Sequence, residues 1–146
     1  MNERNYRRKL PHWRTDGATY FVTWRVAPDG AKLDSIERDM VVAALKTLDG
    51  KRYQLTGYVV MDDHVHVLVT PRAEHTLRSI VHSWKSFTAN RMQREYERVG
   101  PVWQDEYFDR IVRDEKELLQ KVEYIMGNPW KRWPELDSYE WVWPLP

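Results

Sequence analysis

The segment VVMDDHVHVLV, residues 59–69, most constrains the fold, because it is almost entirely apolar yet contains four polar residues. An apolar, β-branched run of this length predicts a buried strand. Burial of a charged group is costly unless the group is paired or binds a metal. The four polar residues are Asp62, Asp63, His64 and His66. The fold must therefore provide ionic, hydrogen-bonding or metal partners for them.

The two histidines are expected to point to the same face of the strand, because side chains alternate along it. Their imidazoles would lie about 7 Å apart along the strand, close enough to converge on one divalent cation. Val65, Val67 and Val69 would point to the other face and pack against helices. A lone histidine in such a strand is usually only hydrogen-bonded, and that alternative stays open. The pairing after two aspartates favours a metal site.

The remaining patterns predict the order βαββαβα. Asp34 and Asp114 each begin a capping box, with a glutamate three residues later, and so mark two helix starts. Pro129 is expected to end the last helix. The order predicts an α+β fold with a ferredoxin-like antiparallel sheet, helices packed on one face and a C-terminal helix. The expected strands are 18–26, 53–61, 64–70 and 107–113, and the expected helices are 35–48, 76–98 and 115–128.

The 146 residues are expected to form a single domain, 1–146, with a basic and aromatic N-terminal arm (1–17) and a Trp-rich tail (129–146). The sequence has no cysteine, which excludes disulfides and thiolate metal sites. No apolar run approaches the roughly 20 residues that span a bilayer, and no signal peptide is visible. A cytoplasmic location is therefore expected.

Basic and aromatic residues are mixed in the N-terminal arm, as suits single-stranded nucleic acid, where cations contact phosphates and flat rings contact bases. A frayed, solvated terminus is the alternative. The Trp-rich tail is a second candidate for such contact. The alternative there is packing against the sheet or a helix edge, which is expected to account for at least half of its tryptophans. The residues of the arm favoured for nucleic-acid contact are Arg7, Arg8, His12, Trp13 and Arg14.

The long helix predicted over 76–98 has an apolar side to which Trp84 and Phe87 belong, so both are expected in the core. Lys85 lies off that side and could face a ligand or water.

In the last predicted helix, the apolar residues form one stripe and Tyr124 lies nearly opposite its centre. Asn128 lies one turn further along on the side of Tyr124, and Lys121 lies on the turn before it. An amide oxygen at that place suits an oxygen-preferring cation. The alternative is an ordinary exposed tyrosine, and the helix alone does not decide between the two.

Taken together, these segments resemble the REP-associated tyrosine transposases, a branch of the single-tyrosine HUH (IS200-like) transposases. The resemblance covers most of the 146 residues. The matching segments, in order, are LPHWRTDGATYFVTWRV, GYVVMDDHVHVLV, LRSIVHSWKSFTANR, VWQDEYFDRIVRDEKEL and YIMGNPWKRWPELDSYEWVW. At the position of Asp62 members of this family usually have proline.

The resemblance implies that His64 and His66 of the HUH motif, together with Asn128, bind a divalent metal, Mg²⁺ or Mn²⁺. It implies that Tyr124 is the nucleophile of a single-stranded DNA transposase or nickase. Such an enzyme cleaves and rejoins DNA next to palindromic hairpins through a 5′-phosphotyrosine intermediate, as a monomer or homodimer in the bacterial cytoplasm or nucleoid. The spacing of Lys121 from Tyr124 adds the hypothesis that Lys121 helps to activate the phenol.

Two alternatives stay open from the sequence. One is a regulatory protein that binds hairpin DNA or RNA without cutting it, and the other is a metal-dependent hydrolase with no covalent step. Lys85, Lys131 and Arg132 are further candidates for contact with DNA, after the residues of the N-terminal arm.

Overall fold

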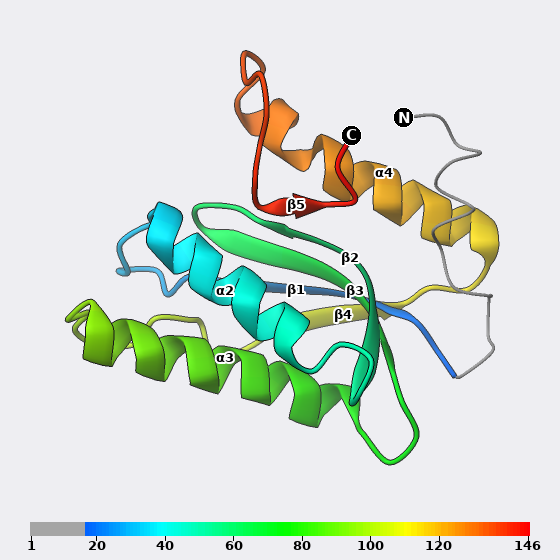
Figure 1. The fold of residues 1–146 in the computed structure, drawn as a ribbon, viewed down its shortest axis with the longest axis horizontal. Helices are drawn as coiled ribbons and strands as arrows, with labels where there is room; N and C mark the ends of the chain where they lie inside the picture. The colour runs from blue at the N-terminus through cyan, green and yellow to red at the C-terminus, as the bar shows by residue number, and fades with distance from the viewer. Residues whose placement is uncertain (1–16) are drawn as a thin grey trace.

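A five-stranded antiparallel sheet in the order β4-β1-β3-β2-β5 organises residues 17–146, the part of the chain that the computed structural model describes (Figure 1). The strand that carries both histidines, β3, lies in the middle between β1 and β2. The predicted α+β class and element order are confirmed, and the two-residue strand β5 is an addition. The elements are β1 (Tyr20–Arg25), α2 (Ser35–Thr47), β2 (Tyr53–Val60), β3 (His64–Pro71), α3 (Leu77–Glu95), β4 (Phe108–Ile111), α4 (Glu115–Arg132) and β5 (Val142–Trp143).

The two faces of the sheet bury two separate apolar cores. Val65 and Val67 belong to the larger core, which they share with residues of α2 and α3. Val59 and Leu68 belong to the smaller core, which they share with the apolar stripe of α4. Helices α2 and α3 therefore lie together on one face as predicted, while α4 covers the other (Figure 1). Because alternate residues share a face, His64 and His66 lie on the face covered by α4.

The two predicted capping boxes differ in the structure. At α2 the box is complete: the Asp34 carboxylate accepts from the Glu37 backbone N–H at 2.8 Å, and the Glu37 carboxylate accepts from the Asp34 N–H at 3.0 Å. At α4 only one bond of the box forms, in which the Asp114 carboxylate accepts from the Glu117 backbone N–H. The Glu117 carboxylate instead pairs with Arg110 at 3.0 Å and Arg113 at 3.3 Å. Competition from these two guanidinium groups explains why the predicted reciprocal contact is missing.

The prediction that Pro129 ends the last helix is wrong, because α4 continues to Arg132 with the proline inside it. Proline removes one backbone donor, but the next turn closes through the Trp133 N–H, which donates to the Pro129 carbonyl at 2.8 Å. Pro129 itself is buried. The extra turn carries Lys131 and Arg132, which places both basic side chains at a defined end of the helix.

The core prediction for α3 is correct for Trp84 and wrong for Phe87. Trp84 is buried and its indole N–H donates to the Tyr53 hydroxyl at 3.0 Å. Phe87 is 55% exposed. The buried side of α3 continues in steps of four through Thr88 and Met92. Phe87 therefore lies about 90° away from its centre at 100° per residue.

The Trp-rich tail is mostly packing, as expected. Trp130, Trp133 and Trp141 pack against the smaller core, and Tyr139 is buried within it. The Tyr139 hydroxyl donates to the Val60 carbonyl at 2.7 Å. Among the helices of residues 17–146, none is both long and apolar enough to cross a membrane.

The contrast between the two aromatic residues of α3 can be measured. Trp84→Ala should lower the free energy of unfolding by about 3–5 kcal/mol, because it leaves a large cavity in the core and removes the indole donor to the Tyr53 hydroxyl. Phe87→Ala should change it by about 0.5 kcal/mol or less, as for other exposed side chains. Urea unfolding followed by circular dichroism checks both. Equal losses would contradict the assignment of the two side chains.

Candidate metal and tyrosine site

The two histidines lie side by side on the face of β3 that α4 covers. Their ring centroids are 4.7 Å apart, with the planes at 68°. His66 is 5% exposed, whereas His64, at the start of the strand, is half-buried. Both belong to the central strand, whose backbone is paired on both sides. Their spacing is therefore held by the sheet and does not depend on a loop.

Each imidazole uses its Nδ1 atom within the protein. His64 Nδ1 lies 2.7 Å from Asp63 Oδ1, and His66 Nδ1 lies 2.7 Å from Thr23 Oγ1. When Nδ1 carries the proton and donates it in these bonds, Nε2 keeps a free lone pair. Partners of this kind commonly fix the tautomer and the orientation of histidines that bind metals. Both rings therefore have the outer contacts that a metal ligand needs.

Burial keeps His66 uncharged. Its pKa falls from 6.5 to about 3, first because burial penalises the charged ring and then because of positive charge on His64, Arg25 and Lys121. At neutral pH the ring is thus the neutral imidazole that a metal requires.

Helix α4 brings Tyr124 against the same imidazole. The Tyr124 and His66 ring centroids are 5.4 Å apart in an edge-to-face arrangement. Phe21 of β1 completes the cluster, stacked on His66 at 5.1 Å and at an edge to Tyr124 at 6.0 Å. Tyr124 remains 40% exposed, so its phenol contacts the site and is still open to a ligand. The Tyr124 and His66 rings are thus in contact in the structure.

Asn128 supplies an unpaired oxygen one turn further along α4. The residue is 8% exposed, and its Oδ1 atom is buried without a hydrogen-bond partner in residues 17–146. A buried carbonyl without a partner costs about 1–3 kcal/mol, and a cation would remove that cost. No group of three or more His, Cys, Asp or Glu residues in the same range could hold a metal. Two imidazoles and this amide oxygen are the donor set that fits a divalent cation.

Two lysines flank the tyrosine. Lys131 Nζ lies 4.8 Å from the centre of the Tyr124 ring, and Lys121 Nζ lies 4.9 Å from the centre of the Phe21 ring. Both predicted residues are thus at the site, although Lys131 is the one that lies over the tyrosine. A cation at this place attracts phosphate.

Arg132 ties the end of α4 to the loop before the histidines. Its guanidinium contacts the Asp62 carboxylate at 3.1 Å and the Asp63 carboxylate at 3.4 Å. Asp63 in turn contacts His64. Arg132 was predicted to contact DNA, but its closest partners are these two aspartates. Its position makes it a clamp between the tyrosine helix and the histidine strand.

The other predicted contacts for DNA lie elsewhere. Lys85 is on α3, on the opposite side of the sheet, and its Nζ donates to the carbonyls of Gln104 at 2.7 Å and Asp105 at 3.0 Å. Burial also lowers the pKa of Lys85. The structure does not bring this lysine to the site. The arm residues Arg7, Arg8, His12, Trp13 and Arg14 lie outside the described residues.

Sequence reasoning missed Thr23 and Phe21, both on β1. Thr23 is directly opposite His66 in the antiparallel register. Alternation along residues 18–26 shows that the two share a face of β1, but the strand that pairs with β1 is not encoded in the local pattern.

Comparison with known proteins agrees with this arrangement. The family described as "Transposase IS200 like" matches residues 31–128, more than half of the chain. A Haemophilus influenzae protein named "Putative REP-associated tyrosine transposase" is 26% identical over 142 residues, covering 87% of this chain and 76% of that protein. An uncharacterised protein of the same organism is 41% identical over 54 residues, which are 37% of this chain and only 29% of that protein.

Two solved structures share the fold. The structure of a REP-associated tyrosine transposase bound to a REP hairpin has a TM-score of 0.70 and 19% identity, covering 97% of this chain and 82% of that one. The structure of a "putative transposase" from Deinococcus radiodurans R1 has a TM-score of 0.56 and 19% identity, covering 79% of this chain and 92% of that one. The extent of the family match shows that the chain belongs to the IS200-like transposase family, with distant homology to the REP-associated tyrosine transposases.

Proposed function

We propose that the protein cleaves and rejoins single-stranded DNA next to a palindromic hairpin, with Tyr124 as the nucleophile. The observation that carries the proposal is the contact of the partly exposed Tyr124 ring with His66, beside His64, with the buried and unpaired Asn128 oxygen one turn further along α4. Family membership agrees with this chemistry, and a distant structural relative is bound to a REP hairpin.

His64, His66 and Asn128 would hold the divalent cation, Mg²⁺ or Mn²⁺, which when bound supplies positive charge at the scissile phosphate. Asp63 and Thr23 keep the two imidazoles oriented, with the Nε2 lone pairs available. Burial of His66 excludes water from one side of the site.

In the covalent step the Tyr124 oxygen loses its proton and forms a bond to phosphorus, while the bond from phosphorus to the 3′ oxygen breaks. The 3′ oxygen takes up a proton and leaves as a hydroxyl, and the 5′ phosphate stays on the tyrosine. Reversal of the step with another 3′-hydroxyl rejoins the DNA. Lys131 over the phenol ring, with Lys121 nearby, stabilises the developing negative charge.

The first test is a covalent adduct. Wild-type protein mixed with a labelled hairpin that has single-stranded flanks, in Mn²⁺ or Mg²⁺, should give a protein–DNA band that survives denaturing electrophoresis. EDTA and Tyr124→Phe should each abolish the band. Tyr96→Phe is the matched control, because Tyr96 is also 40% exposed but lies at the end of α3. A hairpin mobility shift without an adduct would favour the regulatory protein, and cut DNA without an adduct would favour the hydrolase.

The second test concerns the hydrogen bond between Thr23 Oγ1 and His66 Nδ1. Thr23→Val keeps the shape of the side chain but removes the Nδ1 partner, so Mn²⁺ affinity should fall about 10- to 100-fold in calorimetric titration. Thr70→Val is the control, because the Thr70 hydroxyl contacts Thr19 at 2.6 Å on the same face of the sheet. Unchanged Mn²⁺ affinity in Thr23→Val would show that His66 is not a ligand held in this way.

The third test concerns the clamp. Arg132→Met should slow adduct formation about 10- to 100-fold, because α4 would no longer be held at a fixed distance from the histidine strand. The free energy of unfolding should fall by about 1–3 kcal/mol, because the Asp62 carboxylate is largely buried and loses its nearest cation. Arg110→Met removes an ion pair at the other end of α4 and should leave the rate unchanged. Equal rates in Arg132→Met and wild type would contradict a positioning role.

A further inference from the structure

Arg25 is a charged residue beside the two histidines that the chemistry above does not use. It is the last residue of β1 and lies directly opposite His64 in the antiparallel register, just as Thr23 lies directly opposite His66. Residues directly opposite each other in an antiparallel pair point to the same face of the sheet, with Cβ atoms about 4.5–5.5 Å apart. The Arg25 side chain therefore leaves the sheet on the face that α4 covers, next to a proposed metal ligand.

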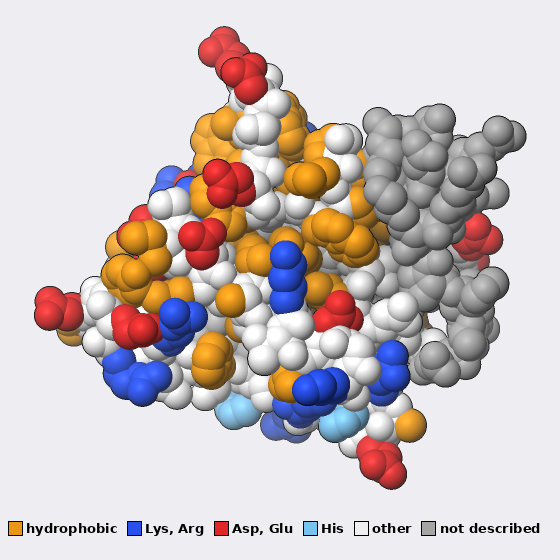
Figure 2. All heavy atoms as spheres, viewed as in Figure 1, with side chains coloured by type: hydrophobic (Ala, Val, Ile, Leu, Met, Phe, Trp, Pro, Cys, Tyr) orange, Lys and Arg blue, Asp and Glu red, His pale blue; other side chains and the backbone are white. Residues whose placement is uncertain are grey.

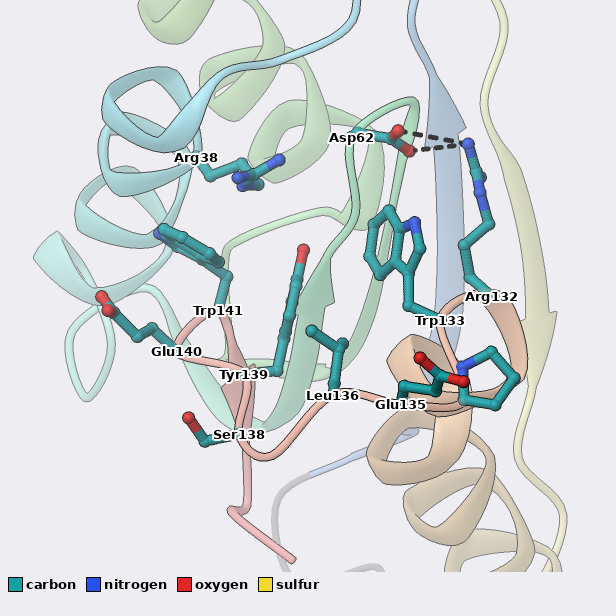
Figure 3. Close-up of a pocket in the computed structure, with 11 residues that line it drawn as sticks. Arg38, Asp62, Arg132, Trp133, Glu135, Leu136, Ser138, Tyr139, Glu140 and Trp141 are labelled. Atoms are coloured by element: carbon teal, nitrogen blue, oxygen red, sulfur yellow. Dashed lines mark hydrogen bonds and ion pairs between the residues drawn. The ribbon is translucent and has the colours of Figure 1, made fainter.

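The Arg25 guanidinium keeps its charge available for a ligand. The residue is exposed, and none of the ion pairs within residues 17–146 involves it. Asp63 lines the same cavity of about 250 Å³ as Arg25, but its carboxylate contacts His64 at 2.7 Å and Arg132 at 3.4 Å. The neighbouring carboxylate of Asp62 is also paired with Arg132 (Figure 3). The acidic groups next to the histidines are thus taken by other partners.

The backbone of Arg25 is fixed although its side chain is unpaired. The Arg25 carbonyl accepts from the Gln104 N–H at 2.9 Å, and the next residue, Val26, donates its N–H to the Asp63 carbonyl at 2.9 Å. Gln104 is held in turn, because its carbonyl accepts from the Lys85 ammonium at 2.7 Å. A guanidinium on such a rigid strand end is preorganised, as suits a group that stabilises charge in a transition state.

The reactive groups form a row along β1 and β3. Tyr124 contacts Phe21 and His66 at one end of the row. Arg25 and His64 stand at the other end, with Arg25 about 13 Å beyond Phe21 along the strand. In an in-line displacement the attacking and leaving oxygens lie on opposite sides of phosphorus. With the phenol at one end of the row, the leaving 3′ oxygen faces the end where Arg25 stands.

Other cations near the site are differently placed. Lys131 and Lys121 flank the tyrosine, at the end of the row from which attack comes. Lys, Arg and His side chains also gather along α3 (Figure 2), but α3 covers the other face of the sheet (Figure 1). Arg25 is therefore the cation that matches the leaving side of the phosphate.

We propose that Arg25 is a catalytic residue that binds the scissile phosphate on the side of the leaving 3′ oxygen. The inference rests on the proposed function and assigns the group that stabilises the leaving oxygen. As the bond from phosphorus to the 3′ oxygen breaks, negative charge grows on that oxygen, and the guanidinium donates hydrogen bonds to it and to a non-bridging oxygen. Arginine does not give up its proton, so the proton that completes the 3′-hydroxyl comes from water.

The test compares two leaving groups at one phosphodiester, whose position is mapped from the wild-type adduct. Hairpin DNA is made with either the natural 3′ oxygen or a bridging 3′ sulfur at that position. Arg25→Met should slow adduct formation about 100- to 1,000-fold with oxygen, as is usual when one preorganised donor is lost. With sulfur the loss should be about 10-fold or less, because a thiolate is a good leaving group without a hydrogen-bond donor.

Binding of DNA to Tyr124→Phe in EDTA, followed by fluorescence anisotropy, gives a readout without cleavage. A neutral methylphosphonate at the scissile position should weaken binding about 10-fold, because a hydrogen bond to a charged group is lost. Adding Arg25→Met should cause the same loss on natural DNA and no further loss on the methylphosphonate. Arg25→Lys keeps the charge without the planar fork, so it should restore binding more than the rate.

Arg72→Met is the matched control, because Arg72 is also exposed but follows the other end of β3. It should match wild type with both leaving groups. Equal slowing of Arg25→Met with oxygen and sulfur, an unchanged rate, or additive losses with the methylphosphonate would overturn the role of Arg25 and leave the strand-transfer function intact. Absence of any wild-type adduct would overturn both proposals.

Discussion

The packing of α4 on the sheet is the interaction on which the rest of the structure depends. Leu118, Val122 and Ile125 are buried against Val59 and Leu68, which share a face of the sheet with the histidines. An amphipathic helix held by such a stripe has its rotation fixed, because turning it would expose the apolar residues. The polar edge of the helix is then presented to β3. That edge carries Tyr124 and Asn128, so an ordinary hydrophobic contact sets the geometry of the reactive groups.

The electrostatics of the site follow from the same burial. His66 is kept neutral by its apolar surroundings and by the positive charges of His64, Arg25 and Lys121. Arg25 and Lys121 would also attract an anionic ligand such as a phosphate. The whole chain has a formal net charge of only +1, so this field is local to the site. A metal ion would give the unpaired Asn128 oxygen a partner. A polyanion would neutralise the clustered positive charge.

Local pattern accounts for much of this arrangement. Strand alternation predicted that His64 and His66 share a face, and helical periodicity predicted that Tyr124 avoids the apolar stripe. Both features depend only on residue spacing. Thr23 behind His66 could not be predicted in the same way, because it depends on which strand pairs with β3 and in which register. The prediction that Phe87 is in the core was wrong for a related reason. The buried stripe of α3 shifts around the helix along its length, and the elements that pack against α3 decide which side chains at the edge of the stripe are buried.

The turn after Pro129 shows how the rule that proline ends a helix can miss the last turn of α4. A proline disfavours a helix interior, but it removes only one donor, and burial of Pro129 with the neighbouring tryptophans compensates for the loss. The added turn points Lys131 at the tyrosine ring and Arg132 at the two aspartates before the histidines. Without that turn, the tail would leave the helix at Asn128, and the contacts of Arg132 with Asp62 and Asp63 would not form. Tertiary packing thus extends the helix past the point that propensity predicts, and the extension ties the tyrosine helix to the loop before the histidines.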